Sequence, residues 1–590
     1  MIHICYAYIR HSKALDHVGI KIDSQYDYHY DDNSRVLTIS HNKRYPRNFW
    51  GDGVYSLAAI IGNNGAGKST AMEFLLETLL EGANRREVDG VLVYENDGKL
   101  EIWGSNVKVK TKLPHEFVCE IPKISCFYYC GHFMPYVNYN DMRFSELAGG
   151  YNASDGWLLL KDLQSYTNVD SMYMDKPLAW HLNVFVARNN SRICRMLADK
   201  KVRDTFKSFI LPKYILVGVN QSGYYALLAK KRTGQVKQEI PERRVVNADS
   251  KNRLLESFIY YDFLNIANEG FGLNSDEVLK ALDVWQTNQS VNDEVLLRLK
   301  SFYENGNWSQ ELTAYLKSIY VIMTKVVALC GFYDDNVSQL FYLHSEKDSN
   351  KLSILVHEVL NEWPFLTASY FDLYYSQELG GKTILSSGEQ NLLDLFSRLY
   401  DALVISTSKF ANVDSKRLVL LDEAEIGFHP DWQRKYIDLI LQFLQTLVLV
   451  RPGEDFQVLI STHSPILLSD IPGCCVNYLE RDSNGIVHVL EREDVKETFA
   501  TNVFEQYRDS FFMRDGLIGE FARKKLIAVQ DTIEKDGITD ETLKVVGMIG
   551  DVRIKEYLMQ KIAKQNIDAE IDYYKEKIKE LKRRKTQNNE

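Results

Sequence analysis

Residues 56–70 read SLAAIIGNNGAGKST, and this stretch decides the fold. A short apolar run precedes a glycine-rich loop, and the loop precedes AMEFLLETLLEG at 71–82, where apolar residues recur at helical spacing. The loop fits the pattern G-x-x-x-x-G-K-[ST], in which glycines let backbone N–H groups converge on phosphate oxygens. The sequence therefore predicts a strand, a phosphate-binding loop and a helix, in that order.

The side chains of this loop indicate how a nucleotide would be held. Lys68 supplies a point charge beside the outer phosphates, the Ser69 hydroxyl is a ligand for Mg²⁺, and the start of the helix adds its positive end. The residues predicted to surround the phosphates are Gly62, Asn63, Asn64, Gly65, Ala66, Gly67, Lys68, Ser69 and Thr70.

A second element is LVLLDE at 418–423, four apolar residues that end in two acids. A buried strand of this kind would deliver Asp422 to the Mg²⁺ shell, and the next carboxylate, Glu423, can polarise an attacking water. Two acids at a strand end could otherwise form a solvated turn. The phosphate loop earlier in the chain favours the catalytic interpretation.

The third element is LSSGEQ at 385–390, which stands directly before the amphipathic run NLLDLFSRLYDALVI. Ser386, Ser387 and Gly388 are therefore expected at a helix N-terminus, where backbone N–H groups favour an anion. Taken alone, the same letters describe an ordinary helix cap.

Together these motifs resemble the ABC superfamily of ATPases, whose usual LSGGQ signature has the form LSSGEQ here. The resemblance implies that ATP and Mg²⁺ bind between two head-to-tail copies, with the signature of one copy facing the phosphate loop of the other. It also implies that His463, in LISTHSP at 459–465, is a switch histidine that contacts the γ-phosphate. A lone histidine at a strand end would otherwise carry no such meaning.

Two details narrow the resemblance to SMC, RecF and OLD-like heads. DEAEIGFHP at 422–430 is similar to the DEPE-x-x-LHP form of that group, and residues 498–525 resemble the region after the switch histidine in PtuA-type defence ATPases of Septu and retron systems. This implies a sensor ATPase of antiviral, anti-phage defence that forms a homodimer or higher oligomer and controls an effector, such as an HNH-type nuclease or another toxin.

The alternatives are a RecF/SMC-like DNA repair ATPase and an OLD-type nuclease. The nuclease reading needs a D-x-D pair, which is absent after His463.

The expected fold class is α/β, an ABC-type head with N-terminal antiparallel strands, a compact helical insertion and a helical C-terminus. Strands are predicted at 4–9, 18–23 and 36–40, which should form one small antiparallel sheet. A hairpin is predicted at 214–231, and a further strand at 124–133 in place of the family's glutamine segment. The predicted domains are a first ATPase lobe at 1–140, a mainly helical insertion at 141–370, a second lobe at 371–480 and a partner-binding region at 481–590.

Ile567, Ile571, Tyr574, Ile578 and Leu581 recur at steps of four and three, which suits either an interaction helix or packing on the helix's own domain.

Composition bounds the remaining possibilities. The 590 residues are 45% apolar and 25% charged, and eight scattered cysteines do not form a disulfide framework. Neither a long apolar stretch nor a signal-like N-terminus is present, so a cytoplasmic protein with reduced thiols and no membrane contact is expected. The net charge of −10 argues against a wholly basic surface, and DNA contact is left open at the basic clusters. These clusters are 230–232, 523–525 and 582–585.

Overall fold

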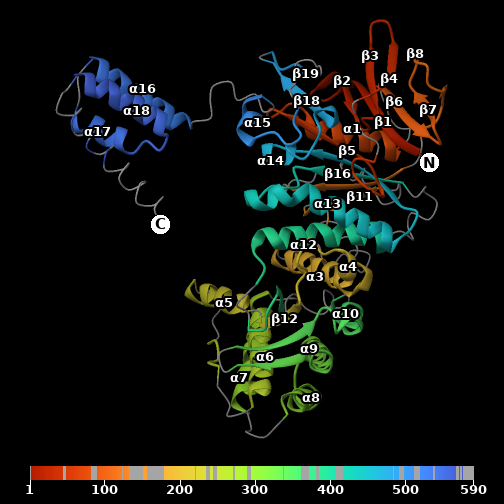
Figure 1. The fold of residues 1–590 in the computed structure, drawn as a ribbon. Coiled ribbons are helices and arrows are strands. Elements are labelled where there is room, and N and C mark those ends of the chain that lie inside the picture. Colours follow the sequence, from red (N-terminus) through yellow and green to blue (C-terminus); the bar gives the residue numbers. More distant parts are fainter. Residues whose placement is uncertain are drawn as a thin grey trace. The chain divides into compact units, whose positions relative to one another are not determined.

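The structure is a computed structural model (Figure 1). The part of the chain that it describes comprises residues 2–43, 45, 48–81, 90–121, 124–131, 150–155, 158, 178–219, 221–233, 239–243, 249–269, 273–288, 294–335, 338–360, 371–380, 384–405, 416–482, 484–490, 497–509, 519–535, 539–565, 571, 575 and 578. The chain separates into two compact units, Met1–Phe511 and Phe512–Glu590.

A seven-stranded sheet forms the centre of the larger unit. Its order is β11 (Gly150–Asn152), β10 (Ser125–Cys130), β16 (Lys416–Asp422), β17 (Asp455–Ser461), β5 (Val54–Gly62), β18 (Val476–Arg481) and β19 (Val487–Val489). Neighbouring strands are parallel except β18 and β19. The predicted parallel sheet is confirmed, and near-continuous burial of β5, β16 and β17 explains their unbroken apolar sequences. Because β19 extends this sheet, residues after 480 still belong to the larger unit.

Helix α1 (Lys68–Glu81) packs between the central sheet and a second, N-terminal sheet. Side chains alternate along each strand, so Ala58 and Ile60 of β5 face α1 while Leu57 and Ala59 face the opposite layer. The core around α1 also contains Ile4 from the N-terminal sheet. The helix that starts at the phosphate loop is thus fixed by apolar contacts on two sides.

The N-terminal sheet has five strands in the order β2 (Leu15–Lys21), β1 (Ile2–Ser12), β6 (Gly90–Asn96), β7 (Lys99–Trp103) and β9 (His115–Phe117). The first two predicted strands pair antiparallel, as expected. The prediction that 36–40 joins them is wrong, because β4 (Val36–His41) lies in a separate sheet with β3 (Tyr26–Asp31) and β8 (Lys108–Lys110). A buried turn at Asp23, whose carboxylate accepts from the Gln25 backbone N–H, redirects the chain between the two sheets.

On the other face of the central sheet, α13 (Pro430–Val450) lies between the strands and α12 (Ser387–Tyr400) (Figure 1). Helices α3 (Leu178–Ala198) and α4 (Lys200–Thr205) pack on α12 and α13 respectively. Shorter elements complete the unit: α14 (Pro465–Leu468), α15 (Val503–Asp509), a 3₁₀ turn at Gly473–Cys475, and π-helical turns at Val356–Leu360 and Asp401–Ile405.

The insertion contains a sheet that the sequence interpretation missed. Besides α3 and α4, the helices described within 141–370 are α5 (Ser222–Arg232), α6 (Ser250–Glu269), α7 (Ser275–Thr287), α8 (Val295–Asn305), α9 (Gln310–Leu329) and α10 (Ser349–Leu355). The sheet's four strands follow the order β13 (Gly331–Asp334), β14 (Gln339–His344), β12 (Tyr214–Val219) and β15 (Phe371–Ser376). Strand β15 pairs with β12, so residues 371–376 belong to this sheet although they were predicted in the second ATPase lobe.

The predicted hairpin at 214–231 is wrong in its second half. Strand β12 forms, but residues 222–232 form helix α5 and the strand's partners come from β14 and β15. The segment YYALLAKK is rich in good helix formers and lacks the alternation that a half-buried strand requires.

Helix α9 is long and apolar enough to cross a membrane by length and composition, with a mean hydropathy of 1.4. Its buried residues, among them Leu312, Leu316, Ile319, Met323 and Val326, follow the three-and-four spacing of one helix face, and α9 contacts α8 and β14. Because polar residues occupy its other face, we interpret α9 as a core helix of the insertion.

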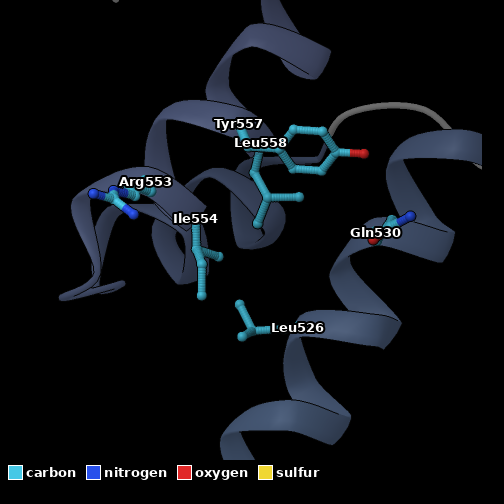
Figure 2. A pocket seen from close by; sticks show the side chains of 6 residues that line it. All are labelled: Leu526, Gln530, Arg553, Ile554, Tyr557 and Leu558. Atoms are coloured by element: carbon cyan, nitrogen blue, oxygen red, sulfur yellow. The ribbon is translucent and has the colours of Figure 1, made fainter. Parts of the chain in front are cut away.

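The described part of the smaller unit contains α16 (Glu520–Lys535), α17 (Asp540–Gly547) and α18 (Val552–Gln565), which enclose the core residues Val529, Ile533, Val546, Leu558 and Ile562. A groove of about 370 Å³ lies between α16 and α18 (Figure 2). Of the predicted tail helix, only Ile571 and Ile578 among its repeat positions are described, and both are exposed. Ile567, Tyr574 and Leu581 lie outside the described residues, as does the basic cluster at 582–585.

Candidate functional site

The phosphate loop lies at the carboxyl end of β5, and α1 begins at Lys68. Gly65 and Gly67 have φ values of +78° and +86°, a conformation that side chains disfavour. A Cβ on Gly67 would also lie 2.4 Å from Leu15 Cδ2. Ala66 is fully buried and donates its N–H to the Asn63 carbonyl at 3.0 Å. The loop is therefore fixed by its own backbone and by the N-terminal sheet.

Strand register brings the acidic strand and the switch segment to the same edge of the sheet. Asp422 lies opposite Ser461, and Ser461 lies opposite Ile60, two residues before the phosphate loop. The carboxyl ends of parallel strands form the usual ligand-binding edge of such a sheet. Residues separated by several hundred positions in the chain thus meet at one place.

Lys68, Glu423 and His463 contact one another at this edge. The Lys68 Nζ atom lies 2.6 Å from His463 Nε2 and 3.6 Å from Glu423 Oε1, and His463 Nε2 lies 3.2 Å from the same carboxylate oxygen. Burial lowers the pKa of the Lys68 ammonium, while the carboxylates of Glu423 and Asp422 act in the opposite direction. The structure therefore places the predicted phosphate lysine, general base and switch histidine side by side.

Asp422 is held by two hydroxyl groups that the sequence interpretation did not assign. Tyr128 donates its hydroxyl to Asp422 Oδ2 at 3.0 Å, and Ser461 donates its hydroxyl to Oδ1. Burial and the nearby Asp422 carboxylate raise the pKa of Tyr128, so this phenol remains a donor. Tyr128 comes from the predicted strand at 124–133. Its contact with Asp422 has no sequence signature, because the pairing of two strands that are distant in the chain leaves no local pattern.

The backbone of Glu423 is also constrained. Its φ of +49° is unusual for a residue with a side chain and costs about 1–2 kcal/mol. The Glu423 N–H donates to the Ser461 carbonyl at 3.0 Å. A Cβ on Gly131 would lie 2.3 Å from the Glu423 carbonyl oxygen, so the end of β10 approaches this backbone closely. These contacts aim the Glu423 side chain at Lys68.

Glu425 connects the loop after the acidic strand with the switch segment. Its carboxylate accepts from the Thr462 hydroxyl, which itself accepts from the Ser464 N–H at 2.9 Å. Ser464 then donates to Gln433 of α13 at 2.8 Å. Burial raises the pKa of Glu425, which is 4% exposed. These contacts set the position of the residues that flank His463.

The predicted signature residues lie at a helix N-terminus, as expected. Ser386 caps α12 in a reciprocal capping box with Glu389, and Gly388 is buried against Trp432. Among the described residues, no hydrogen bond or ion pair joins 386–388 to 62–70. Within one chain, the signature and the phosphate loop are therefore not brought together.

The signature helix is anchored instead to α3. Arg398, which is 2% exposed, donates to Asn189 Oδ1 at 3.2 Å and to the Ala153 carbonyl at 3.1 Å, and it pairs with Asp155 at 2.6 Å. A buried guanidinium with several partners fixes the geometry of α12 more than it adds stability.

The two described basic clusters lie on helices α5 and α16. Lys230, Lys231 and Arg232 end α5, where Lys231 pairs with Glu239. In the smaller unit, Arg523 and Lys524 pair with Glu520 of their own helix. DNA contact at either cluster stays a prediction.

The fold and the site define a P-loop nucleotide-binding ATPase domain of the ABC-like kind, built on a mainly parallel sheet. Residues 333–469 match the protein family described as "AAA domain, putative AbiEii toxin, Type IV TA system". The match includes the signature, the acidic strand and the switch histidine, and it does not reach the phosphate loop.

A curated protein, "Protein ea59" of Escherichia phage lambda, is 31% identical over 129 residues, which is 22% of this chain. The matched region spans 21% of the length of ea59.

Proposed function

We propose that this chain hydrolyses ATP. The observation that carries the proposal is the contact among Lys68, Glu423 and His463 at the carboxyl ends of β5, β16 and β17. Lys68 would neutralise the outer phosphates, Glu423 would accept a proton from the attacking water, and His463 would contact the γ-phosphate. With the nucleotide bound, Lys68 would exchange its contact with Glu423 for the phosphates and leave the carboxylate available as base.

The donor set at this edge suits Mg²⁺. The Ser69 hydroxyl and the Asp422 carboxylate are hard oxygen donors, and Asp422 is 2% exposed with its orientation set by Tyr128 and Ser461. Mg²⁺ bound there would neutralise phosphate charge. The residues of the chain would hold the carboxylate in place.

The site is proposed to be completed by a second copy of the chain. Ser386, Ser387 and Gly388 form a helix N-terminus suited to the γ-phosphate, yet within one chain they make no hydrogen bond or ion pair with 62–70 among the described residues. Ile384 beside the signature and Ile426 beside the acidic strand are 52% and 39% exposed. A head-to-tail homodimer would cover both and join each signature to the other copy's phosphate loop.

Mixing two inactive variants tests the composite site. Lys68→Ala should not bind ATP, and Ser386→Arg should bind but not hydrolyse. In a mixed dimer, one site carries both substitutions and the other carries neither, so mixing should restore about a quarter of the wild-type rate. If Ser386→Arg alone hydrolyses ATP at the wild-type rate, or if mixing restores nothing while mixed dimers form, the composite site is refuted.

We further propose that the ATPase acts in antiviral defence in the cytoplasm and controls a separate effector, such as a nuclease or another toxin. Support comes from the toxin named in the description of the matching family, from eight cysteines that are all free of disulfides, and from the insertion and C-terminal unit, which an ATPase core does not need. Co-expression with the neighbouring reading frame, followed by purification with and without ATP, tests the pairing. Failure of any neighbouring product to copurify in either state would contradict it.

A further inference from the structure

Arg481 is the last residue of β18, the strand that runs beside the phosphate-loop strand. In the β5–β18 register, Leu479 lies opposite Gly62, where the loop begins. Leu479 belongs to the core around α1, and side chains two residues apart on a strand face the same side. Arg481 therefore extends from β18 toward the place where the phosphate loop turns into α1.

The turn between β18 and β19 orients the guanidinium group. Arg481 Nε donates to the Gly485 carbonyl at 3.2 Å. Its Nη1 atom lies 3.1 Å from the position that a Cβ on Gly65 would occupy, and its Nη2 atom lies 3.2 Å from the corresponding position on Gly485. The guanidinium thus lies between the turn and the phosphate loop. The absence of a side chain at Gly65 permits this close approach.

Among the described residues, no carboxylate pairs with the guanidinium of Arg481. The neighbouring Asp482 accepts hydrogen bonds from the backbone N–H groups of Asn484 and Ile486 and lies 3.3 Å from His488. Within the described part of the chain, Arg481 forms no ion pair. Lys68, in contrast, already faces Glu423. An unneutralised guanidinium beside a phosphate-binding loop provides two donors for an anionic oxygen.

We propose that Arg481 is an additional ligand for the nucleotide phosphates, supplied by the same chain as the phosphate loop. The inference rests on the proposed binding of ATP at Lys68 and adds a second cation on the outer side of the loop. A guanidinium offers parallel N–H donors that match phosphate geometry, which a lysine cannot reproduce.

Calorimetric titration of the full-length chain with MgATP and with MgADP tests the assignment. Arg481→Ala should weaken binding by about 10- to 100-fold, because a hydrogen bond to a charged group is lost. Arg481→Lys should weaken binding less, since it keeps the positive charge but lacks the parallel N–H donors of the guanidinium. Arg232→Ala removes the same charge from an exposed position on α5 and serves as the matched control, with affinity expected to stay at the wild-type value.

Arg481 is exposed, so the thermal unfolding midpoint of the nucleotide-free variants should stay unchanged, and binding to Arg481→Ala should depend less on salt than wild-type binding. An affinity of Arg481→Ala within twofold of wild type, measured beside a Lys68→Ala variant that does not bind, would overturn this inference alone. If Lys68→Ala itself binds with wild-type affinity, the nucleotide is elsewhere and the proposed function fails too.

Discussion

Replacing Tyr128 with phenylalanine removes one hydroxyl and leaves the ring in the core. The lost bond is the 3.0 Å contact to Asp422 Oδ2, made from a residue on the neighbouring strand β10. Hydrogen bonds to charged groups contribute about 1.5–3 kcal/mol, so unfolding of the larger unit should become easier by about 2 kcal/mol. Ser461 still holds Oδ1, so the carboxylate stays in place but is less well oriented.

The functional consequence should be confined to Mg²⁺. Loss of a residue that orients a metal ligand typically weakens metal binding by about 10- to 100-fold. The concentration of free Mg²⁺ for half-maximal ATP hydrolysis by Tyr128→Phe should rise by that factor. The rate at saturating Mg²⁺ should be close to wild type, because Glu423 and His463 contact each other without Tyr128. Initial rates of phosphate release across a Mg²⁺ series give both quantities.

Tyr436→Phe is the matched control for this experiment. Tyr436 is fully buried, and within the described part of the chain its hydroxyl has no hydrogen-bond partner, so its removal should leave both stability and Mg²⁺ dependence near wild type. If Tyr128→Phe lowers stability while its Mg²⁺ requirement is unchanged, Tyr128 is a packing residue and does not orient the metal ligand. A fall in the saturating rate with an unchanged Mg²⁺ requirement would also exclude the orienting role.

Three further predictions concern other parts of the chain. Burial raises the pKa of Asp23 from 3.8 to about 7, so its contribution to stability is full below pH 3.8 and falls by roughly 4 kcal/mol as pH rises from about 4 to about 7. Urea unfolding of Asp23→Asn should lack this pH slope, and an identical slope would exclude Asp23 as its source. Gly67→Ala should abolish ATP binding and lower stability by about 1–2 kcal/mol or more, because φ is +86° and Leu15 blocks the Cβ. Wild-type affinity for ATP in a titration would show that the phosphate loop accommodates the added Cβ. The purified chain alone should not cut supercoiled or linear DNA with Mg²⁺ or Mn²⁺. The reason is that the described residues contain no group of three or more His, Cys, Asp or Glu placed to hold a further metal. Cleavage that a point substitution in this chain abolishes would support the OLD-type nuclease instead.

Sequence alone predicted the parts of the site that depend on short segments. The phosphate loop, the acidic strand and the helix after Ser386 are each specified by consecutive residues, and the structure forms all three. Near-continuous apolar runs also predicted the parallel sheet, because strands covered on both faces need them.

What the sequence did not predict depends on which strands become neighbours. Tyr128 meets Asp422 only because β10 pairs with β16, and Arg481 meets the phosphate loop only because β18 pairs with β5. The insertion's sheet was missed for the same reason, since β12 and β15 are more than 150 residues apart and their pairing leaves no local pattern.

In the proposed function, Glu423 activates water for ATP hydrolysis at the edge where Lys68 and His463 meet. The most direct test is the rate of phosphate release from MgATP by the purified chain and by Glu423→Gln, which keeps the side-chain shape and removes the base. We expect the rate to fall by about 10²- to 10⁴-fold, with ATP binding retained and an ATP-bound dimer accumulating in sizing chromatography. Hydrolysis by Glu423→Gln at the wild-type rate would show that Glu423 is not the base and assign that role elsewhere.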